Sequence, residues 1–296
     1  MRHLSYLIFL LLLCSCSAPK PYFEIESNNQ KYEAPTNLKF VNQSEKAEQY
    51  IWDFGDGNTS SSFSPEHRYS ASGRYEISLK AIKGNSTKLF KKVIQLVPPK
   101  DCLVEIETSL GVIVIKLYEN TPLHRDNFIR LAGNGFYEGT LFHRVIKGFM
   151  IQGGDPDSKN ASEGKRLGSG GPGYTIPSEF SDTLIHTKGA LAAARQGDSV
   201  NPKKASSGSQ FYIVQGRPVP ASQLENIELQ KGIKYTQQGK EAMLNVGGTP
   251  SLDKEYTVFG HVVEGIEIID KIAESKTDEA DRPVIDVKIL RVKIIQ

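Results

Sequence analysis

The order of apolar and polar residues divides the chain into regions of different character. An apolar run from Leu7 to Leu13 follows a short basic start. Beyond residue 21, short stretches alternate apolar and polar residues, as in Tyr75, Ile77 and Leu79, and clusters of Gly, Asp, Asn and Ser separate these stretches. Alternation with a period of two indicates half-buried β-strands. We therefore expect a mainly β protein.

A domain boundary is expected in the stretch LVPPK at residues 96–100, where two prolines interrupt the strand pattern. A chain of 296 residues also exceeds what one hydrophobic core usually serves. We predict a leader at 1–15, a polar tether at 16–21, a first domain at 22–98 and a second domain at 99–296.

The second domain opens with a predicted hairpin and then alternates strands with short helices. In CLVEIETSLGVIVIKLY, two alternating runs meet at Ser109-Leu110-Gly111. Thr121-Pro122 provides an N-cap residue and a proline for the first helical position, and Gly133 ends that helix. Residues 265–273 have helical spacing, and the final residues, VIDVKILRVKIIQ, predict a strand.

The segment at 220–246 is polar and helical in pattern. Ser222 and Glu225 have the spacing of a capping box. The segment is either a solvated helical excursion with a few apolar residues against the second domain, or a lid over a binding groove.

The leader has the layout of a secretory signal, with an apolar run too short to span a bilayer. It ends in LCSC, and a Leu three residues before Cys16, with Ser15 between, resembles the lipobox of bacterial lipoproteins. That resemblance implies cleavage before a lipidated Cys16 and a lipid-anchored protein of the bacterial cell envelope. The alternative is an ordinary cleaved signal peptide. After cleavage before Cys16 and lipidation of that residue, Cys102 would be the one unmodified cysteine of the three in the sequence. No intramolecular disulfide is therefore expected.

Charge and motif spacing exclude several functions. A formal net charge of +2 without a long basic run does not indicate nucleic-acid binding. His143 lacks partners at zinc-ligand spacing, and Asp155-Pro156-Asp157 lacks the further oxygen ligands of an EF-hand loop. The stretch GSGGPG lacks the Lys and Ser/Thr of a phosphate-binding loop. We expect no metal and no cofactor.

The first domain carries the run WDFGDG at 52–57, followed by HRY and GRY, and closely resembles the PKD family of immunoglobulin-like domains. The resemblance implies a small β-sandwich. Trp52 and Phe54 occupy alternate positions and should fill its core, and Asp56-Gly57 should form a tight turn. The domain is either a spacer or a module that contacts a protein or a glycan.

Three runs of the second domain, FHRVIKGFMIQGGD at 142–155, GSQFYIV at 208–214 and SLDKEYTVFGHVVEG at 251–265, together resemble the cyclophilin-type peptidyl-prolyl isomerases. The resemblance implies a closed eight-stranded antiparallel barrel with two capping helices and a substrate groove on its outside. It also implies that the protein accelerates rotation about X-Pro bonds in proline-containing peptides or unfolded segments. We expect a monomer.

The same resemblance assigns roles to individual residues. Arg144 matches the catalytic arginine, whose donors stabilise the twisted amide; the alternative is a surface arginine paired with a nearby acid. Met150 and Gln152 share strand parity and can therefore face one groove. The predicted substrate-binding residues are Phe149, Met150, Gln152, Ala194, Arg195, Gln210, Tyr212, Leu252 and Tyr256.

Three positions depart from the family's common pattern. Arg195 lies where many eukaryotic members have Asn, and Tyr256 lies where many have a pocket His. Ser251 stands where many have the Trp that is tied to cyclosporin binding, so we expect weak sensitivity to that drug. The rival hypothesis is a module that binds proline-containing segments, or a PKD-led adhesin, without catalysis.

Overall fold

The computed structural model describes residues 18–26, 32–69, 72–97 and 102–295. They form two compact units, the first mainly from residues before Val97 and the second mainly from residues after it. The predicted leader at 1–15 and the lipidation residue Cys16 lie outside the described residues. Within the described ranges, no helix combines the length and apolar character that crossing a bilayer requires.

The end of the predicted tether is attached to the first unit. Lys20 forms an isolated antiparallel bridge with Glu45, with backbone N–H···O distances of 2.9 and 3.0 Å in the two directions. Pro19 is buried. The described tether residues 18–21 are therefore part of this unit's structure.

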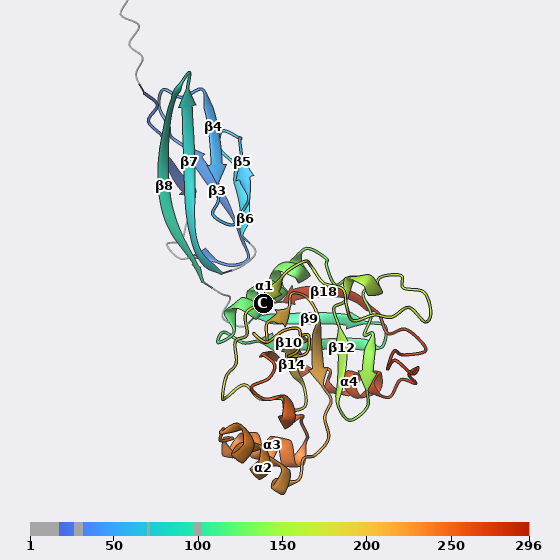
Figure 1. The fold of residues 1–296 in the computed structure, drawn as a ribbon. Helices are drawn as coiled ribbons and strands as arrows, with labels where there is room; N and C mark the ends of the chain where they lie inside the picture. Colours follow the sequence, from blue (N-terminus) through green and yellow to red (C-terminus); the bar gives the residue numbers. More distant parts are fainter. Residues whose placement is uncertain (1–17, 27–31, 70–71, 98–101, 296) are drawn as a thin grey trace, which may run out of the picture. The chain divides into compact units, whose positions relative to one another are not determined.

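The first unit consists of two antiparallel sheets (Figure 1). One sheet has the order β1-β3-β6 and the other β2-β8-β7-β4-β5. The bounds are β1 Phe23–Glu26, β2 Tyr32–Glu33, β3 Thr36–Asn42, β4 Gln49–Asp53, β5 Thr59–Ser60, β6 Glu66–Tyr69, β7 Gly73–Lys83 and β8 Ser86–Val97.

The first unit has an aromatic core that includes Trp52 and Phe54, the two side chains predicted from the sequence to fill it. Trp52 is fully buried, Phe54 is 2% exposed, and the Trp52 ring lies edge-on to Phe23 at a centroid distance of 5.0 Å. The Asp56 carboxylate accepts the backbone N–H of Asn58 at 3.1 Å, which closes the turn. The WDFGDG run therefore has a structural explanation.

The second unit is organised around an eight-stranded antiparallel sheet with the order β11-β12-β16-β14-β17-β10-β9-β18. The predicted hairpin is β9 and β10, and the predicted final strand is β18. The bounds are β9 Leu103–Thr108, β10 Gly111–Leu117, β11 Arg144–Ile146, β12 Met150–Gly153, β14 Ala190–Ala193, β16 Phe211–Val214, β17 Val258–Glu264 and β18 Ile289–Ile295, with β13 Thr175–Ile176 and β15 Ser206–Ser207 in a separate two-stranded sheet.

The predicted closed barrel is wrong, because this sheet is a curled half-barrel. Its edge strands β11 and β18 share no ladder of hydrogen bonds in the described structure. Residues 139–142, just before β11, bond to residues 287–289 through backbone N–H···O contacts of 2.8–2.9 Å around an isolated bridge between Leu141 and Lys288. A loop meets the outer edge of β11 instead, since the backbone N–H of Val145 donates to the Asp281 carbonyl at 2.8 Å.

Helices α1 (Pro122–Gly133) and α4 (Ile266–Ala273) are the two predicted capping helices, and both contribute to the main core. Phe128 of α1 and Ile269 of α4 are buried in one cluster with sheet residues such as Ile106 and Ile113. Burial of this apolar surface is the main stabilising term for the unit.

The cap of α1 comes from a distant loop. The Thr121 side chain makes no capping hydrogen bond. Instead, the Glu179 carboxylate accepts the backbone N–H groups of Leu123 and His124, each at 3.0 Å, and lies 2.6 Å from His124 Nδ1. Burial raises the pKa of Glu179, but the hydrogen bonds from His124 and Leu123 outweigh it and hold the pKa below its usual value.

The segment at 220–246 forms two helices, α2 (Ala221–Lys231) and α3 (Gln237–Asn245), which lie beside each other in Figure 1. We call these residues the insertion. The capping-box prediction is wrong, because α2 begins at Ala221 after Pro220, which places Ser222 inside the helix. Leu224 and Met243 are buried in a separate small apolar cluster.

Candidate active site

Arg144 begins the edge strand β11 and lies directly opposite Gln152 of β12. Its side chain is 44% exposed, and its Nε donates to the Asp281 carboxylate at 3.3 Å. Arg144 therefore forms the ion pair with an acid that is expected if it is an ordinary surface arginine. Arg144 itself lines a cavity, so its guanidinium can also meet a ligand there.

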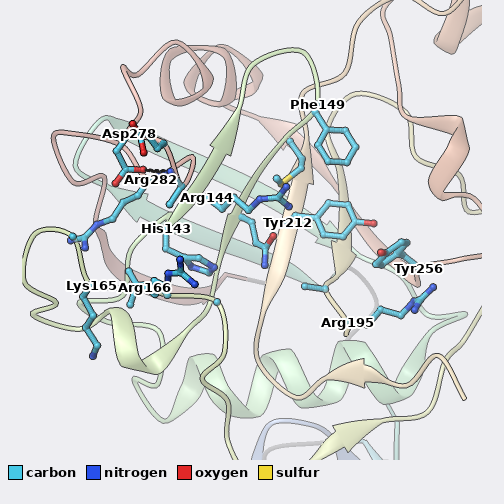
Figure 2. Close-up of a pocket in the computed structure, with 18 of the residues that line it drawn as sticks. His143, Arg144, Phe149, Lys165, Arg166, Arg195, Tyr212, Tyr256, Asp278 and Arg282 are labelled. Carbon is cyan, nitrogen blue, oxygen red and sulfur yellow. Dashed lines mark hydrogen bonds between the residues drawn. The ribbon is translucent and has the colours of Figure 1, made fainter. Parts of the chain in front are cut away.

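The cavity beside Arg144 has a volume of about 590 Å³ and gathers residues that lie far apart in the sequence. Figure 2 shows Arg144 between an apolar side, which carries Phe149 and Tyr212, and a polar side, which carries Lys165 and Asp278. Of the predicted site residues, the ones that line this cavity are Arg144, Phe149, Met150, Gln152, Ala194, Arg195, Tyr212, Leu252 and Tyr256.

The apolar side of the cavity is a small cluster of its own. Met150 and Tyr212 are buried, and Phe149, Leu252 and Tyr256 are half-buried against them. The rings of Tyr212 and Tyr256 meet edge to face, with centroids 5.8 Å apart. This arrangement suits a compact apolar ring, because such a ring would bury its surface without leaving polar groups unpaired.

Strand parity explains how β12 presents its residues. Ile151 points into the main core, whereas Met150 and Gln152 line the cavity on the opposite face, as the alternation predicts. Phe149 does not follow the alternation because it precedes β12, which begins at Met150. The backbone there is in a turn, so Phe149 reaches the cavity as well.

Gln210 lies in a neighbouring cavity of about 830 Å³, which shares Gln152, Ala194 and Arg195 with the first cavity. The Gln152 amide donates to Gln210 Oε1 at 3.1 Å, and the Gln210 amide donates to the Gly170 carbonyl at 2.7 Å. These bonds hold both glutamines in one orientation. The two cavities therefore form a continuous groove with a fixed polar edge between them.

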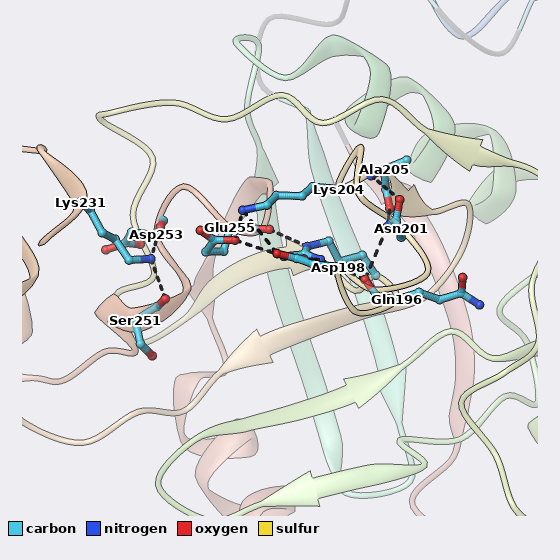
Figure 3. Close-up of polar contacts among 10 residues, drawn as sticks. Gln196, Asp198, Asn201, Lys204, Ala205, Lys231, Ser251, Asp253 and Glu255 are labelled. Carbon is cyan, nitrogen blue, oxygen red and sulfur yellow. Dashed lines mark hydrogen bonds and ion pairs between the residues drawn. The ribbon is translucent and has the colours of Figure 1, made fainter.

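Arg195 is already engaged by the protein. Its guanidinium lies 4.6 Å from the centroid of the Tyr256 ring, and its Nε donates to the Glu255 carbonyl at 2.8 Å. The Glu255 and Asp198 carboxylates also contact it, within the polar network of Figure 3. The guanidinium therefore braces the Tyr256 ring of the cavity wall.

Two loops and one histidine complete the cavity wall and were missed by sequence reasoning. His143 is 4% exposed, and neither ring nitrogen has a hydrogen-bond partner within the described residues. Burial lowers the pKa of His143, although the nearby Asp155 acts in the opposite direction. Residues 164–168 and 278–282 supply most of the polar side. Neither loop has a sequence pattern that connects it to Arg144.

Possible metal ligands do not gather in the part of the chain that the structure describes. No group of three or more His, Cys, Asp or Glu residues there could hold a metal ion. The groove instead offers an apolar ring pocket, oriented amides and a cation. Such a set suits a protein that binds and orients a peptide and stabilises a polarised carbonyl or nitrogen.

Comparison with known protein families identifies the family of this chain. Residues 103–294 match the family model described as cyclophilin type peptidyl-prolyl cis-trans isomerase/CLD, and residues 17–95 match the PKD domain model. The chain belongs to the cyclophilin-type peptidyl-prolyl cis-trans isomerases and carries a PKD domain before the isomerase domain.

The chain is also similar to individual proteins. Proteins of Staphylococcus epidermidis and Staphylococcus aureus that are named as peptidyl-prolyl cis-trans isomerases are 37% identical over 195 residues, which is 64% of this chain and 90% of each relative. A solved Cryptosporidium parvum cyclophilin-type isomerase is 25% identical, with a TM-score of 0.48, and the match covers 66% of this chain and 98% of that one.

Proposed function

We propose that the groove catalyses cis–trans isomerisation of X-Pro bonds in exported polypeptides, with Arg144 as the catalytic residue. The observation that carries the proposal is the position of the Arg144 guanidinium at the edge of the apolar pocket formed around Met150 and Tyr212. A proline ring in that pocket would place its amide beside the cation. In this proposal, the other predicted site residues bind the substrate.

The chemistry requires no covalent step. Amide resonance sets a rotational barrier of about 18–20 kcal/mol, so X-Pro bonds isomerise in tens to hundreds of seconds. In the twisted amide, resonance is lost and the ring nitrogen regains a lone pair. A catalyst must therefore bind this twisted state better than either planar isomer.

Arg144 can supply that preference. Within the described part of the chain, its one polar side-chain contact runs from Nε to Asp281, which leaves the Nη groups for a ligand. Guanidinium N–H groups donate charge-assisted hydrogen bonds to a carbonyl oxygen or to the pyramidal nitrogen. Asp281 would meanwhile keep the guanidinium in place.

The other groove residues have supporting roles in this proposal. Phe149, Met150, Tyr212, Leu252 and Tyr256 enclose the proline ring. Gln152 and Gln210, which are hydrogen-bonded to each other, orient the substrate backbone, as does the segment of Ala194 and Arg195.

The test compares cis–trans exchange of a short single X-Pro peptide, measured by two-dimensional NMR, with and without the purified full chain. Faster exchange at catalytic protein concentrations supports isomerase activity. Peptide resonances that shift on titration while exchange stays at its uncatalysed rate would contradict it and would favour the non-catalytic binding module.

We further propose that the mature chain is a lipoprotein anchored through Cys16, on the bacterial cell envelope. Support comes from the leader pattern that precedes LCSC. In this arrangement the PKD domain serves as a spacer between the lipid and the isomerase domain. Metabolic labelling with an alkyne fatty acid tests the anchor: label should enter the parent chain and be absent from Cys16→Ala, and equal labelling of both would exclude Cys16.

A further inference from the structure

A chain of buried polar groups runs behind the apolar pocket and ends in the insertion. The Tyr212 hydroxyl lies 2.9 Å from His186 Nε2, and His186 Nδ1 lies 2.7 Å from the Asp253 carboxylate. That carboxylate also accepts the His186 backbone N–H at 2.8 Å and the hydroxyl of Tyr235 at 2.7 Å. All four residues are buried, at 7% exposure or less.

The donor and acceptor pattern of this chain orients the Tyr212 ring. A carboxylate can only accept, so in the neutral form of His186 the Nδ1 proton points to Asp253. Nε2 is then an acceptor and receives the hydroxyl proton of Tyr212. Buried groups paired in this way cost free energy to separate, so the network holds Tyr212 from behind.

A second contact from the insertion holds another part of the pocket wall. Lys231, at the end of α2, donates to the carbonyl of Ser251 at 2.7 Å and to the carbonyl of Asp253 at 2.6 Å (Figure 3). These carbonyls flank Leu252, whose side chain lines the pocket. One ammonium group therefore fixes the backbone on both sides of Leu252.

The position of the insertion does not support the lid hypothesis. No residue between 220 and 246 lines either of the two cavities that form the groove. The insertion packs on its own apolar cluster, which includes Leu224, Tyr235 and Met243. Its hydrogen bonds to Ser251 and Asp253 connect it indirectly to the groove.

We propose that the insertion sets the shape of the proline pocket from behind, with Tyr235 and Lys231 as positioning residues. Tyr235 acts through Asp253 and His186 on Tyr212, and Lys231 acts through the backbone around Leu252. The inference rests on the proposed isomerase function, because it assumes that this pocket receives the proline ring. It predicts that the insertion determines affinity for proline-containing segments and leaves the reaction step to Arg144.

The variants Lys231→Met and Tyr235→Phe test this in the purified full chain. Each removes one or two hydrogen bonds from the pocket support while keeping most of the side-chain volume. A looser pocket wall binds the planar and the twisted amide less well to a similar degree, so KM should rise about five- to tenfold and kcat should stay within about twofold. Lys231→Arg, which can still donate to both carbonyls, should restore KM.

A matched control separates positioning from mere stability. Gln237→Met also replaces a polar side chain of the same insertion, but Gln237 donates to Glu241 at 2.8 Å, and this pair has no hydrogen bond to Lys231, Tyr235 or residues 251–253. Its KM should equal that of the parent chain. An equal rise in KM for Gln237→Met and Lys231→Met would overturn the positioning role, as would an unchanged KM in both Lys231→Met and Tyr235→Phe.

The design also distinguishes failure of this inference from failure of the proposed function. If the parent chain does not accelerate exchange, the isomerase proposal fails, and the Kd of the same peptide, measured by NMR titration, replaces KM. A five- to tenfold weaker Kd in Lys231→Met and Tyr235→Phe would then still support the positioning role. Equal Kd values in all variants, or no peptide binding by the parent chain, would overturn it.

Discussion

Replacement of the guanidinium at the groove edge is the sharpest test of the catalytic assignment. In Arg144→Ala the apolar pocket is untouched, because Phe149, Met150 and Tyr212 keep their mutual packing. The fold should lose less than about 1 kcal/mol of stability, since the Arg144–Asp281 pair is an exposed ion pair at 3.3 Å. Any large change in activity would therefore reflect the isomerisation step and not a loss of folded protein.

The size of that change follows from one lost contact. A charge-assisted hydrogen bond is worth about 1.5–3 kcal/mol, which corresponds to about 10- to 150-fold in kcat/KM. Raising a rate from about 0.01 to about 1000 per second requires about 7 kcal/mol, so Arg144 cannot supply all of it. The variant should be slow but should still exceed the uncatalysed rate, because pocket binding and desolvation remain.

The assay is NMR exchange of a single X-Pro peptide, with Arg291→Ala as the matched control. Arg291 on β18 forms an ion pair with Glu107 that is also 3.3 Å long, its side chain is 51% exposed, and it does not line the groove cavities. The control should keep full activity. Activity of Arg144→Ala within twofold of the parent, or an equal loss in Arg291→Ala, would refute the reasoning.

The remaining predictions concern stability, accessibility and inhibition. Glu179→Gln should lower the free energy of unfolding by about 1–2 kcal/mol at pH 7, measured with urea. Because the folded pKa of Glu179 is lowered, this stability exists above its unfolded pKa and is lost as pH falls through the folded pKa, so the two proteins should converge well below about pH 4.3. Burial raises the pKa of the Cys102 thiol to about 11, so iodoacetamide at pH 8 should label it slowly in the folded chain and quickly in urea; equal rates would contradict its burial. Cyclosporin should inhibit weakly, since Ser251 replaces the family's tryptophan and does not line the cavity beside Arg144, and tight inhibition in a titration would show this to be wrong.

Much of the groove could be predicted because its residues lie in short continuous runs. Arg144, Phe149, Met150 and Gln152 fall within one stretch, and strand parity assigns the last two to one face. The resemblance to cyclophilins assigned their roles and added Ala194, Arg195 and the residues of the other two runs. Sequence reasoning missed His143 and the two polar loops as cavity-lining residues, because nothing in a loop's composition states which strand it will lie beside.

The support behind the pocket was also beyond sequence reasoning. His186, Asp253 and Tyr235 are separated by many residues, and each is an ordinary polar residue in its own segment. Only folding brings their side chains within 2.7–2.9 Å of their partners. The insertion was expected to be either a solvated excursion or a lid, and its contacts through residues 251–253 match neither description fully.

The sequence by itself determined the strands, the capping helices and the two-part organisation, because alternation, helical spacing and prolines act locally. Tertiary structure decided how distant segments satisfy one another's backbone groups. Glu179, and not the adjacent Thr121, caps α1, and the outer edge of β11 bonds to the loop at Asp281 and not to β18. Such pairings depend on which groups folding brings within hydrogen-bond distance, and that distance is a property of the whole fold.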